Sequence, residues 1–150
     1  MMKLEGKFMS VGVRNSNGRL YNSSAFATAF EEYKKRVDAG EAYGRIMDIE
    51  HPERSFENNI SDISHRVTEI QWNTENGEIT GKLELLDTPN GKLLQEFVTQ
   101  TGSLYIAPSM IIDNSNTVGG EIKHIERLES FDACKESAWP DAKVKPTTTK

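Results

Sequence analysis

ISHRVTEIQWNTENGEITGKLELL, residues 63–86, is the stretch of sequence that decides the fold. Two strand-like runs within it, residues 63–72 and 79–86, flank the dipeptide Asn76-Gly77. Asn-Gly readily supplies the positive φ angles that a tight hairpin turn needs. The stretch therefore predicts an antiparallel hairpin in the middle of the chain.

Further strand-like segments lie on both sides of this hairpin. Apolar runs occur at residues 4–13, 45–49, 104–112 and 121–134, and residues 104–112 are apolar enough for a central strand although Pro108 lies among them. Strands outnumber helices and do not alternate regularly with them. This pattern favours an α+β fold, a single domain built on a mostly antiparallel sheet or small barrel.

Two amphipathic helices are predicted to pack on this sheet. The first begins after the potential N-cap residues 22–24, ends at Gly40, and has an apolar stripe made of Phe26, Phe30, Tyr33 and Val37. The second begins at the turn residues 87–91 and ends near Gly102, and its apolar residues are Leu93, Leu94, Phe97 and Val98.

The chain of 150 residues is long enough for one compact domain and too short for two ordinary ones. We assign residues 1–144 to this domain and expect residues 145–150 to form a flexible tail. From Lys143 onward the sequence is mostly Lys, Pro and Thr, which offer little apolar surface to bury, so this end should be loose.

Charge and hydropathy argue against several classes of partner. The 18 Lys and Arg residues against 23 Asp and Glu give a net charge of −5 without a basic block, so we expect no direct binding of nucleic acid. No run approaches the ~20 apolar residues of a membrane span, so we expect a soluble, intracellular protein. The single cysteine, Cys134, excludes an intrachain disulfide and a Cys-based zinc cluster.

Among the three histidines, His51 is the one in a position typical of function. It lies where a strand runs into a loop and is followed by Pro52, and catalytic groups are often displayed at such junctions. His65 and His124 fall in strand patterns and are expected to be ordinary sheet residues. No short histidine spacing supports a zinc site of His51, His65 and a carboxylate, and Cys134 is expected to be a small buried side chain.

A series of short motifs occurs in a fixed order between about residue 4 and residue 144. The motifs are RNSNGRLY at 14–21, GRI at 44–46 leading to His51-Pro52, ISHRV at 63–67, GKLELLDTPNGK at 81–92, FDA at 131–133 and SAWPDA at 137–142. This ordered set resembles the prohead core proteases of large tailed phages, whose fold is related to that of the herpesvirus assembly proteases.

The resemblance implies a serine endopeptidase that needs no metal or organic cofactor. Its implied substrates or assembly partners are phage scaffold and capsid proteins, met inside the assembling prohead in the host cytoplasm. A second copy of the chain, in a homo-oligomer, is a further partner to consider. The family uses a serine nucleophile, a histidine base and an aspartate that orients the histidine. Matched motif by motif, His51 is the base and Asp132 is the orienting acid.

The nucleophile position departs from the family pattern. A family strand ends in a sequence like Gly-Val-Ser-Ser-Arg-Gly, whose first serine attacks, and the matching stretch here is YIAPSM at 105–110, with Ala107 at that serine. We expect His51, residues 107–109 and Asp132 to converge in one shallow surface groove. His65 and His124 should lie outside it, with His65 in reserve for Asp132, because the herpesvirus enzymes use a second histidine.

Alanine cannot attack a carbonyl, so the chain as written should be inert unless a neighbour replaces the missing serine. Three explanations stay open. Ala107 is an engineered replacement, or the chain is a naturally non-catalytic virion or scaffold protein, or Ser109 is a shifted nucleophile. Ser109 would lie ~6.5 Å further along the strand, unless a bulge at Pro108 closes the gap. Outside the family, the alternative is an unrelated host-side binding module.

Overall fold

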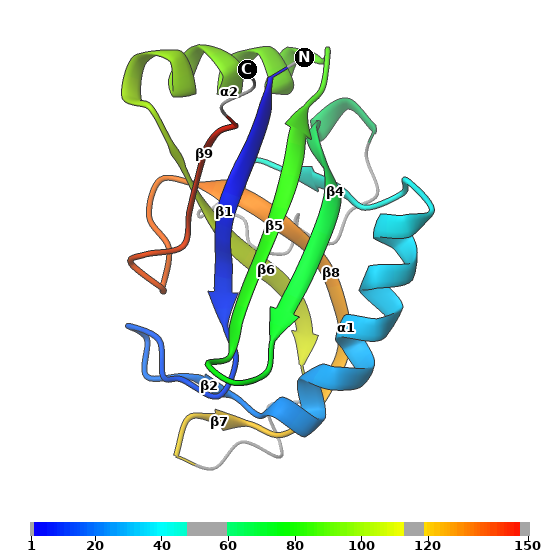
Figure 1. The fold of residues 1–150 in the computed structure, drawn as a ribbon, viewed down its shortest axis with the longest axis vertical. Coiled ribbons are helices and arrows are strands. Elements are labelled where there is room, and N and C mark those ends of the chain that lie inside the picture. Colours follow the sequence, from blue (N-terminus) through cyan, green and yellow to red (C-terminus); the bar gives the residue numbers. More distant parts are fainter. Residues whose placement is uncertain (1, 48–59, 113–118, 148–150) are drawn as a thin grey trace.

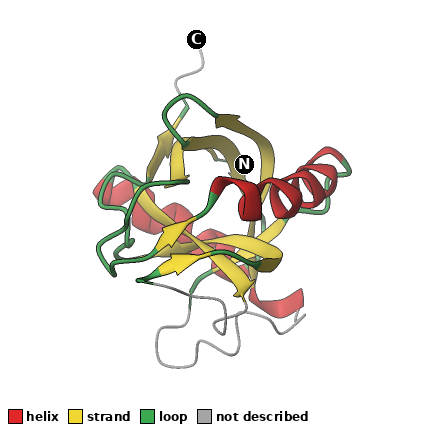
Figure 2. Cartoon of the chain, turned by 90° about the horizontal axis from the view of Figure 1, so that it is seen from below, coloured by secondary structure: helices red, strands yellow, loops and turns green. Residues whose placement is uncertain are grey.

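A computed structural model of the chain describes residues 2–47, 60–112 and 119–147. Seven strands form one sheet in the order β3-β4-β5-β1-β9-β6-β8, and the sheet curls into a nearly closed barrel (Figures 1 and 2). These strands are β1 Lys3–Ser10, β3 Tyr43–Arg45, β4 Ile63–Asn73, β5 Glu78–Leu85, β6 Leu104–Ile112, β8 Ile125–Cys134 and β9 Lys143–Pro146. All neighbouring strands in the sheet are antiparallel. The expected α+β domain with a small antiparallel barrel is confirmed.

Three smaller elements lie outside the barrel in the described part of the chain. The short strands β2 (Leu20–Tyr21) and β7 (Glu121–Ile122) pair in parallel, and the 3₁₀ helix η2 (Ile60–Asp62) leads directly into β4. Buried Tyr21 and Ile122 connect the β2–β7 pair to the hydrophobic core.

The predicted hairpin is the β4–β5 pair, with Asn73 opposite Glu78. Its turn covers residues 74–77 and is longer than the two-residue loop that Asn-Gly often forms. Gly77 has a φ of +77°, while no residue other than glycine has positive φ in the described part of the chain. A Cβ at Gly77 would lie 2.1 Å from the Val11 carbonyl oxygen, so the turn also needs glycine for its close approach to that segment.

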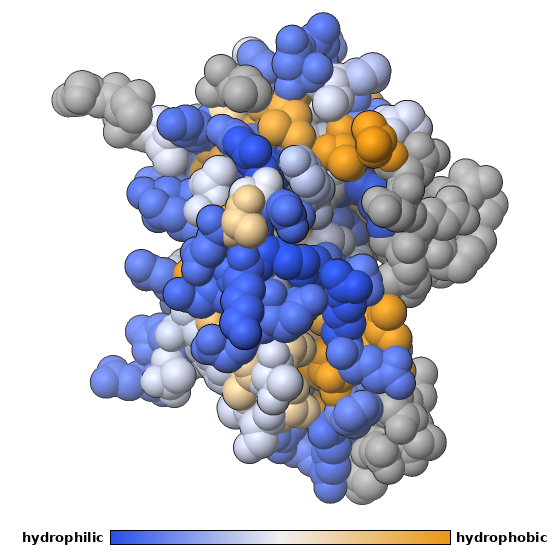
Figure 3. Space-filling view, turned by 90° about the vertical axis from the view of Figure 1, so that its right-hand side faces the viewer, coloured by the Kyte–Doolittle hydropathy of each residue, from blue (hydrophilic) through white to orange (hydrophobic). Residues whose placement is uncertain are grey.

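The first helix is α1 (Ser23–Asp38), and it begins as predicted. The Asn22 side chain accepts hydrogen bonds from the amides of Ser24 and Ala25, at 2.9 and 3.2 Å. The buried face contains the predicted stripe and one further residue, namely Phe26, Ala29, Phe30, Tyr33 and Val37. The side of the molecule on which α1 lies is largely hydrophilic, as Figure 3 shows, because the outer face of the helix is charged.

The ends of the sheet are β3 and β8, and they meet without regular pairing. Ile46 forms an isolated parallel bridge with Ala133, and the Met47 amide donates to the Ala133 carbonyl at 2.8 Å. Since β3 has three residues and β4 has eleven, most of the β4 edge extends beyond β3, and α1 packs there against β4 and β8 (Figure 1). The guanidinium of Arg36 on α1 donates to two carbonyls of β8. The barrel is thus closed partly by a strand and partly by a helix.

The second helix is α2 (Pro89–Thr101), which also begins and ends as predicted. The Thr88 hydroxyl accepts from the Gly91 amide at 3.0 Å, and Gly102 ends the helix with a φ of +90°. No helix in the described ranges has both the length and the apolar character needed to cross a membrane.

The predicted apolar stripe of α2 is only half right. The residues that α2 buries are Gly91, Leu94 and Val98. Leu93 and Phe97 are 57% and 44% exposed. The reason is the close approach of the helix at Gly91, where a Cβ would lie 1.9 Å from the Leu86 carbonyl oxygen. Leu94 and Val98 lie three and seven residues after Gly91, on the same face of the helix, so this contact turns them toward the sheet. Leu93 and Phe97 lie to the side of that face and stay exposed.

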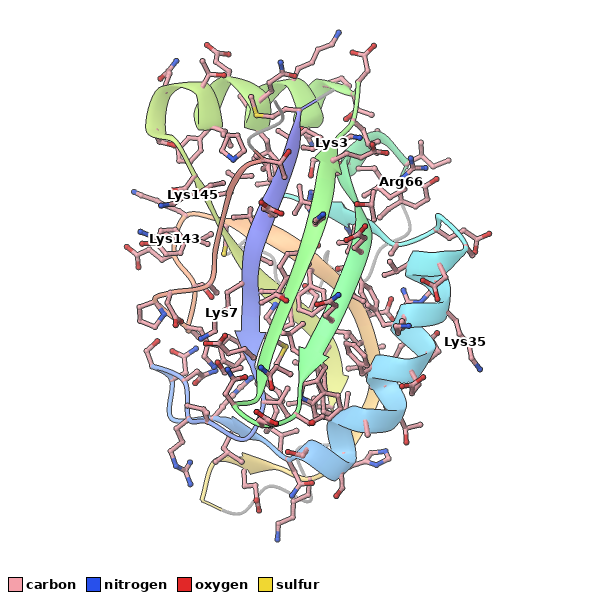
Figure 4. All side chains as sticks on the ribbon, viewed as in Figure 1. Lys3, Lys7, Lys35, Arg66, Lys143 and Lys145 are labelled. Atoms are coloured by element: carbon pink, nitrogen blue, oxygen red, sulfur yellow. The ribbon has the colours of Figure 1, made fainter. Side chains whose placement is uncertain are left out.

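The expectation that the chain is loose from Lys143 onward is wrong. Lys143–Pro146 form β9, which lies between β1 and β6, and Val144 is fully buried. The Thr147 amide donates to the Lys3 carbonyl at 2.9 Å. A strand inserted between two others gains backbone hydrogen bonds on both sides, so it does not need many apolar side chains. Lys143 and Lys145 both lie on this strand (Figure 4). Residues 148–150 lie outside the described residues.

This correction gives the first prediction. Removing residues 145–150 deletes part of β9 and the Thr147 bond, and the loss of about two backbone hydrogen bonds costs about 2 kcal/mol. At this chain length the melting temperature should fall by about 4–8 °C. The matched control is a chain that lacks only residues 148–150. Equal melting temperatures of the two truncated chains, measured by calorimetry, would contradict a stabilising β9.

Candidate functional site

Asp132 is a fully buried carboxylate that binds three parts of the fold. Its Oδ2 accepts from the Ser109 hydroxyl on β6 at 2.5 Å. Its Oδ1 accepts from the Ser130 hydroxyl at 2.8 Å and from the Arg45 amide on β3 at 3.1 Å. Burying a carboxylate is costly unless its oxygens are hydrogen-bonded, and these three donors offset that cost.

The register of β6 and β8 places Ala107 directly opposite Asp132. Ser109 is opposite Ser130, so the side chains of all four residues lie on one face of the strand pair, while Phe131 points to the other face. Directly opposite residues in an antiparallel pair have Cβ atoms about 4.5–5.5 Å apart. The structure therefore brings together Ala107, Ser109 and Asp132, which the sequence had separated by up to 25 positions.

The structure does not place the acid in a surface groove. Asp132 has no exposed surface, Ser109 is 6% exposed, and only Ala107 of the three is half-buried. The expected shallow groove is therefore wrong for Asp132, because the Arg45 backbone covers its carboxylate. His51 lies outside the described residues. The described chain stops at Met47, whose amide is bonded to the residue after Asp132.

The bulge in this strand pair is in β8, where Glu129 is the extra residue, and it lies after Ser109 and not at Pro108. Pairing is regular from Tyr105 to Ser109, and the register shifts between Ser109 and Met110. This bulge therefore does not bring Ser109 closer to the position of Ala107. Ser109 remains two residues along the strand from the position that the family resemblance assigns to the nucleophile.

Pro108 is tolerated within β6 because of the side to which its nitrogen points. The Ile106 amide donates to the Ala142 carbonyl, on the side of β6 that faces β9. Pro108 is two residues further along the strand, so its nitrogen points to the same side. Pairing with β9 ends at Tyr105, so the missing N–H of Pro108 removes no hydrogen bond between strands.

His65 is the polar residue that sequence reasoning placed outside this cluster, and the structure places it beside the cluster. It is fully buried in β4, with Nδ1 2.7 Å from the Ser64 hydroxyl and Nε2 2.8 Å from the carbonyl oxygen of Phe131, the residue before Asp132. Burial lowers the pKa of His65 below its usual 6.5. The neutral ring therefore donates through Nε2 and accepts at Nδ1 from Ser64. His124 is exposed in the link between β7 and β8.

Cys134 ends β8 two residues after Asp132 and is half-buried. Burial, together with the charge of Asp132, raises the pKa of its thiol to about 12. The thiol stays protonated at neutral pH, and the side chain is half-buried where a buried one was expected. Within the described ranges, no group of three or more His, Cys, Asp or Glu side chains is arranged to hold a metal ion.

An open, mostly apolar groove of about 540 Å³ lies beside the Asp132 segment. Its walls come from α2, from the end of β8 and from the chain after β3, and they include Ile46, Met47, Leu93, Phe97, Ala133 and Cys134. The groove accounts for the exposure of Leu93 and Phe97, which face it instead of the core.

Sequence reasoning missed two contributors to the site, namely Ser130 and the Arg45 amide, and it named His65 only as a substitute for Asp132. Ser130 had a usable signal, because a residue two positions before Asp132 on a strand lies on the same face. The contacts that the Arg45 amide and His65 make with β8 had no local signal, since both residues come from strands distant in sequence.

Comparisons with known proteins show the family and the fold of the chain. A family model described as prohead core protein serine protease matches residues 1–149. The solved structure of the bacteriophage T4 capsid assembly protease, gp21, superposes with a TM-score of 0.62 at 18% sequence identity, over 88% of this chain and 80% of that chain. At this identity the structural likeness concerns the fold. No curated protein matches the chain in sequence.

The hydrogen bonds of Asp132 give the second prediction. Replacing Ser130 with alanine removes one donor from a buried carboxylate, so the free energy of unfolding should fall by about 1–3 kcal/mol. Thr68→Ala is the matched control, because the Thr68 hydroxyl also donates within the sheet but in an exposed position, and it should cost less than about 0.5 kcal/mol. Urea denaturation measures both. Equal losses would show that the carboxylate does not depend on Ser130.

The environment of His65 gives the third prediction. Its pKa is lower in the folded chain than the unfolded value of about 6.5, so the unfolded chain binds the proton first as pH falls. The contribution to stability is complete above pH ~6.5 and decreases below it. The melting temperature should therefore fall less between pH 7.5 and 5.5 in His65→Gln than in the unchanged chain. His124→Gln, which removes an exposed histidine, is the control and should follow the unchanged chain.

Proposed function

The chain belongs to the family of prohead core protein serine proteases, and on this premise we propose that it is a capsid-maturation endopeptidase, inactive in this form because Ala107 occupies the nucleophile position. Its proposed substrates are scaffold and capsid proteins of the immature head. The proposed place of action is the interior of the assembling prohead in the host cytoplasm. The similarity in fold to a capsid assembly protease supports this proposal.

The observation that carries the proposal is the register of β6 and β8. Ala107 lies directly opposite Asp132, so a serine at position 107 would have its hydroxyl on the same face as the buried acid. Ser109 lies on the same face of β6, and its hydroxyl already donates to Asp132 at 2.5 Å. In the proposed site, residue 107 is therefore the nucleophile position, and Ser109 supports the acid.

His51 is the proposed base. The resemblance assigns this role to His51, which follows four residues after Met47 in the sequence. The Met47 amide is bonded to Ala133, the residue after Asp132, and this supports the proposal. A carboxylate has about four acceptor positions, and the three described donors leave one for an imidazole N–H. In a chain with serine at 107, His51 would take the hydroxyl proton while Asp132 holds the ring.

A second candidate function is that of a naturally non-catalytic prohead component with the protease fold. Pro108 favours it, because a proline beside the nucleophile position removes an amide that could stabilise an oxyanion. A single replacement of serine by alanine does not account for Pro108. A shifted site with Ser109 as the nucleophile has less support, since Ser109 is buried, donates to the acid and lies before the bulge.

Restoring the hydroxyl tests the proposal. Ala107→Ser should cleave the scaffold protein of the head at least about 10³-fold faster than the unchanged chain, because a triad without its nucleophile loses most of its rate. Discrete fragments on a gel, identified by mass spectrometry, are the measurement. Adding Asp132→Asn to Ala107→Ser should abolish the gain.

Two other outcomes distinguish the alternatives. Failure of Ala107→Ser to cleave would favour the non-catalytic component. Cleavage by the unchanged chain that disappears in Ser109→Ala would contradict the proposal and establish Ser109 as the nucleophile.

A further inference from the structure

The seam between β3 and β8 is held by side chains at the positions next to the site. In the part of the chain that the structure describes, backbone pairing joins the two segments where Ile46 and Met47 meet Ala133. One residue earlier on each side, the Arg45 amide donates to the Asp132 carboxylate at 3.1 Å. The carbonyl of the preceding residue, Phe131, accepts from the His65 ring.

Gly44 makes the His65 contact possible. Gly44 is the β3 residue opposite His65, and a Cβ there would lie 2.1 Å from the His65 Nε2 and 2.6 Å from the Phe131 carbonyl oxygen. No larger residue leaves room for the imidazole, which reaches from β4 past β3 to β8. The glycine therefore provides a passage for a side chain between two strands that are not neighbours in the sheet.

Both nitrogens of the His65 ring have a hydrogen-bond partner, and these partners determine which nitrogen donates and which accepts. The Ser64 hydroxyl lies 2.7 Å from Nδ1 and presents a proton to it, so Nε2 carries the hydrogen that Phe131 accepts. The ring is fully buried, so water does not compete for either bond. The imidazole thus acts as a fixed donor to the β8 backbone.

We propose that His65 is a positioning residue of the candidate site. Through its bond to the Phe131 carbonyl, it holds the β8 backbone where the next side chain, Asp132, reaches the Arg45 amide and lies opposite residue 107. The catalytic consequence rests on the proposed function, whereas the positioning of Asp132 does not. A histidine that only fills space would destabilise the whole barrel on removal and would leave the Arg45–Asp132 bond no weaker than other bonds.

The first test introduces each substitution into the chain that has Ala107 and measures amide hydrogen exchange by NMR. His65→Leu should accelerate exchange of the Arg45 amide at least about 10-fold more than exchange of the Ile79 amide in the β4–β5 hairpin. His65→Gln, which keeps an N–H donor at the reach of Nε2, should restore the Arg45 protection, while the shorter His65→Asn should not. His124→Leu is the matched control and should change neither amide.

Equal acceleration of the Arg45 and Ile79 amides in His65→Leu, or equal protection of Arg45 in His65→Gln and His65→Asn, would overturn the proposal. The Gln and Asn variants keep the test decisive if His65→Leu does not fold, because both fill the cavity with an amide and differ in reach.

The second test adds these changes to Ala107→Ser. His65→Asn should lower kcat about 10-fold or more with KM changed less than about 2-fold, and His65→Gln should recover most of the loss. A loss confined to KM, or no recovery with glutamine, would contradict a positioning role. If Ala107→Ser does not cleave at all, the proposed function fails, and the Arg45 amide still decides the role of His65.

Discussion

The buried carboxylate of Asp132 is the interaction on which the rest of this structure depends. Its oxygens accept from Ser109 on β6, from Ser130 on β8 and from the backbone of Arg45 on β3. These three strands include both ends of the sheet, so the acid links the two edges that must meet for the barrel to close. A buried carboxylate is stable only with such donors. Moving any of the three donor segments away would leave the charge without a hydrogen bond, so the carboxylate holds these segments in place.

The place where β3 and β8 meet and close the barrel is also the place of the candidate site. The residue after Asp132 makes the backbone bonds that join the ends of the sheet, and the residue before it is held by His65. An acid in such surroundings has little freedom to reorient, which is the condition under which a catalytic group works without paying for reorganisation at each turnover. In this chain the described donors to Asp132 are in place, and Ala107, which we propose as the nucleophile position, lacks a hydroxyl.

Local signals predicted most of the elements. Asn22 and Thr88 cap helices where the sequence indicates, and Gly77 and Gly102 adopt positive φ where a turn and a helix end require it. The predictions that were wrong depended on distant partners. The C-terminal strand β9 forms because β1 and β6 offer it backbone partners on both sides. Leu93 faces a groove because the close approach of α2 at Gly91 turns a different face of the helix toward the sheet.

The sequence by itself determined the order and type of the elements, the resemblance to a protease family and the missing hydroxyl at Ala107, because capping, periodicity and residue chemistry are local properties. Only the tertiary structure decided that Asp132 is buried, that Ser109 is its donor and that His65 lies beside the site. Ser109 and Arg45 are 23 and 87 residues from Asp132 along the chain. No local period connects such residues, so their meeting follows from strand register and barrel closure alone.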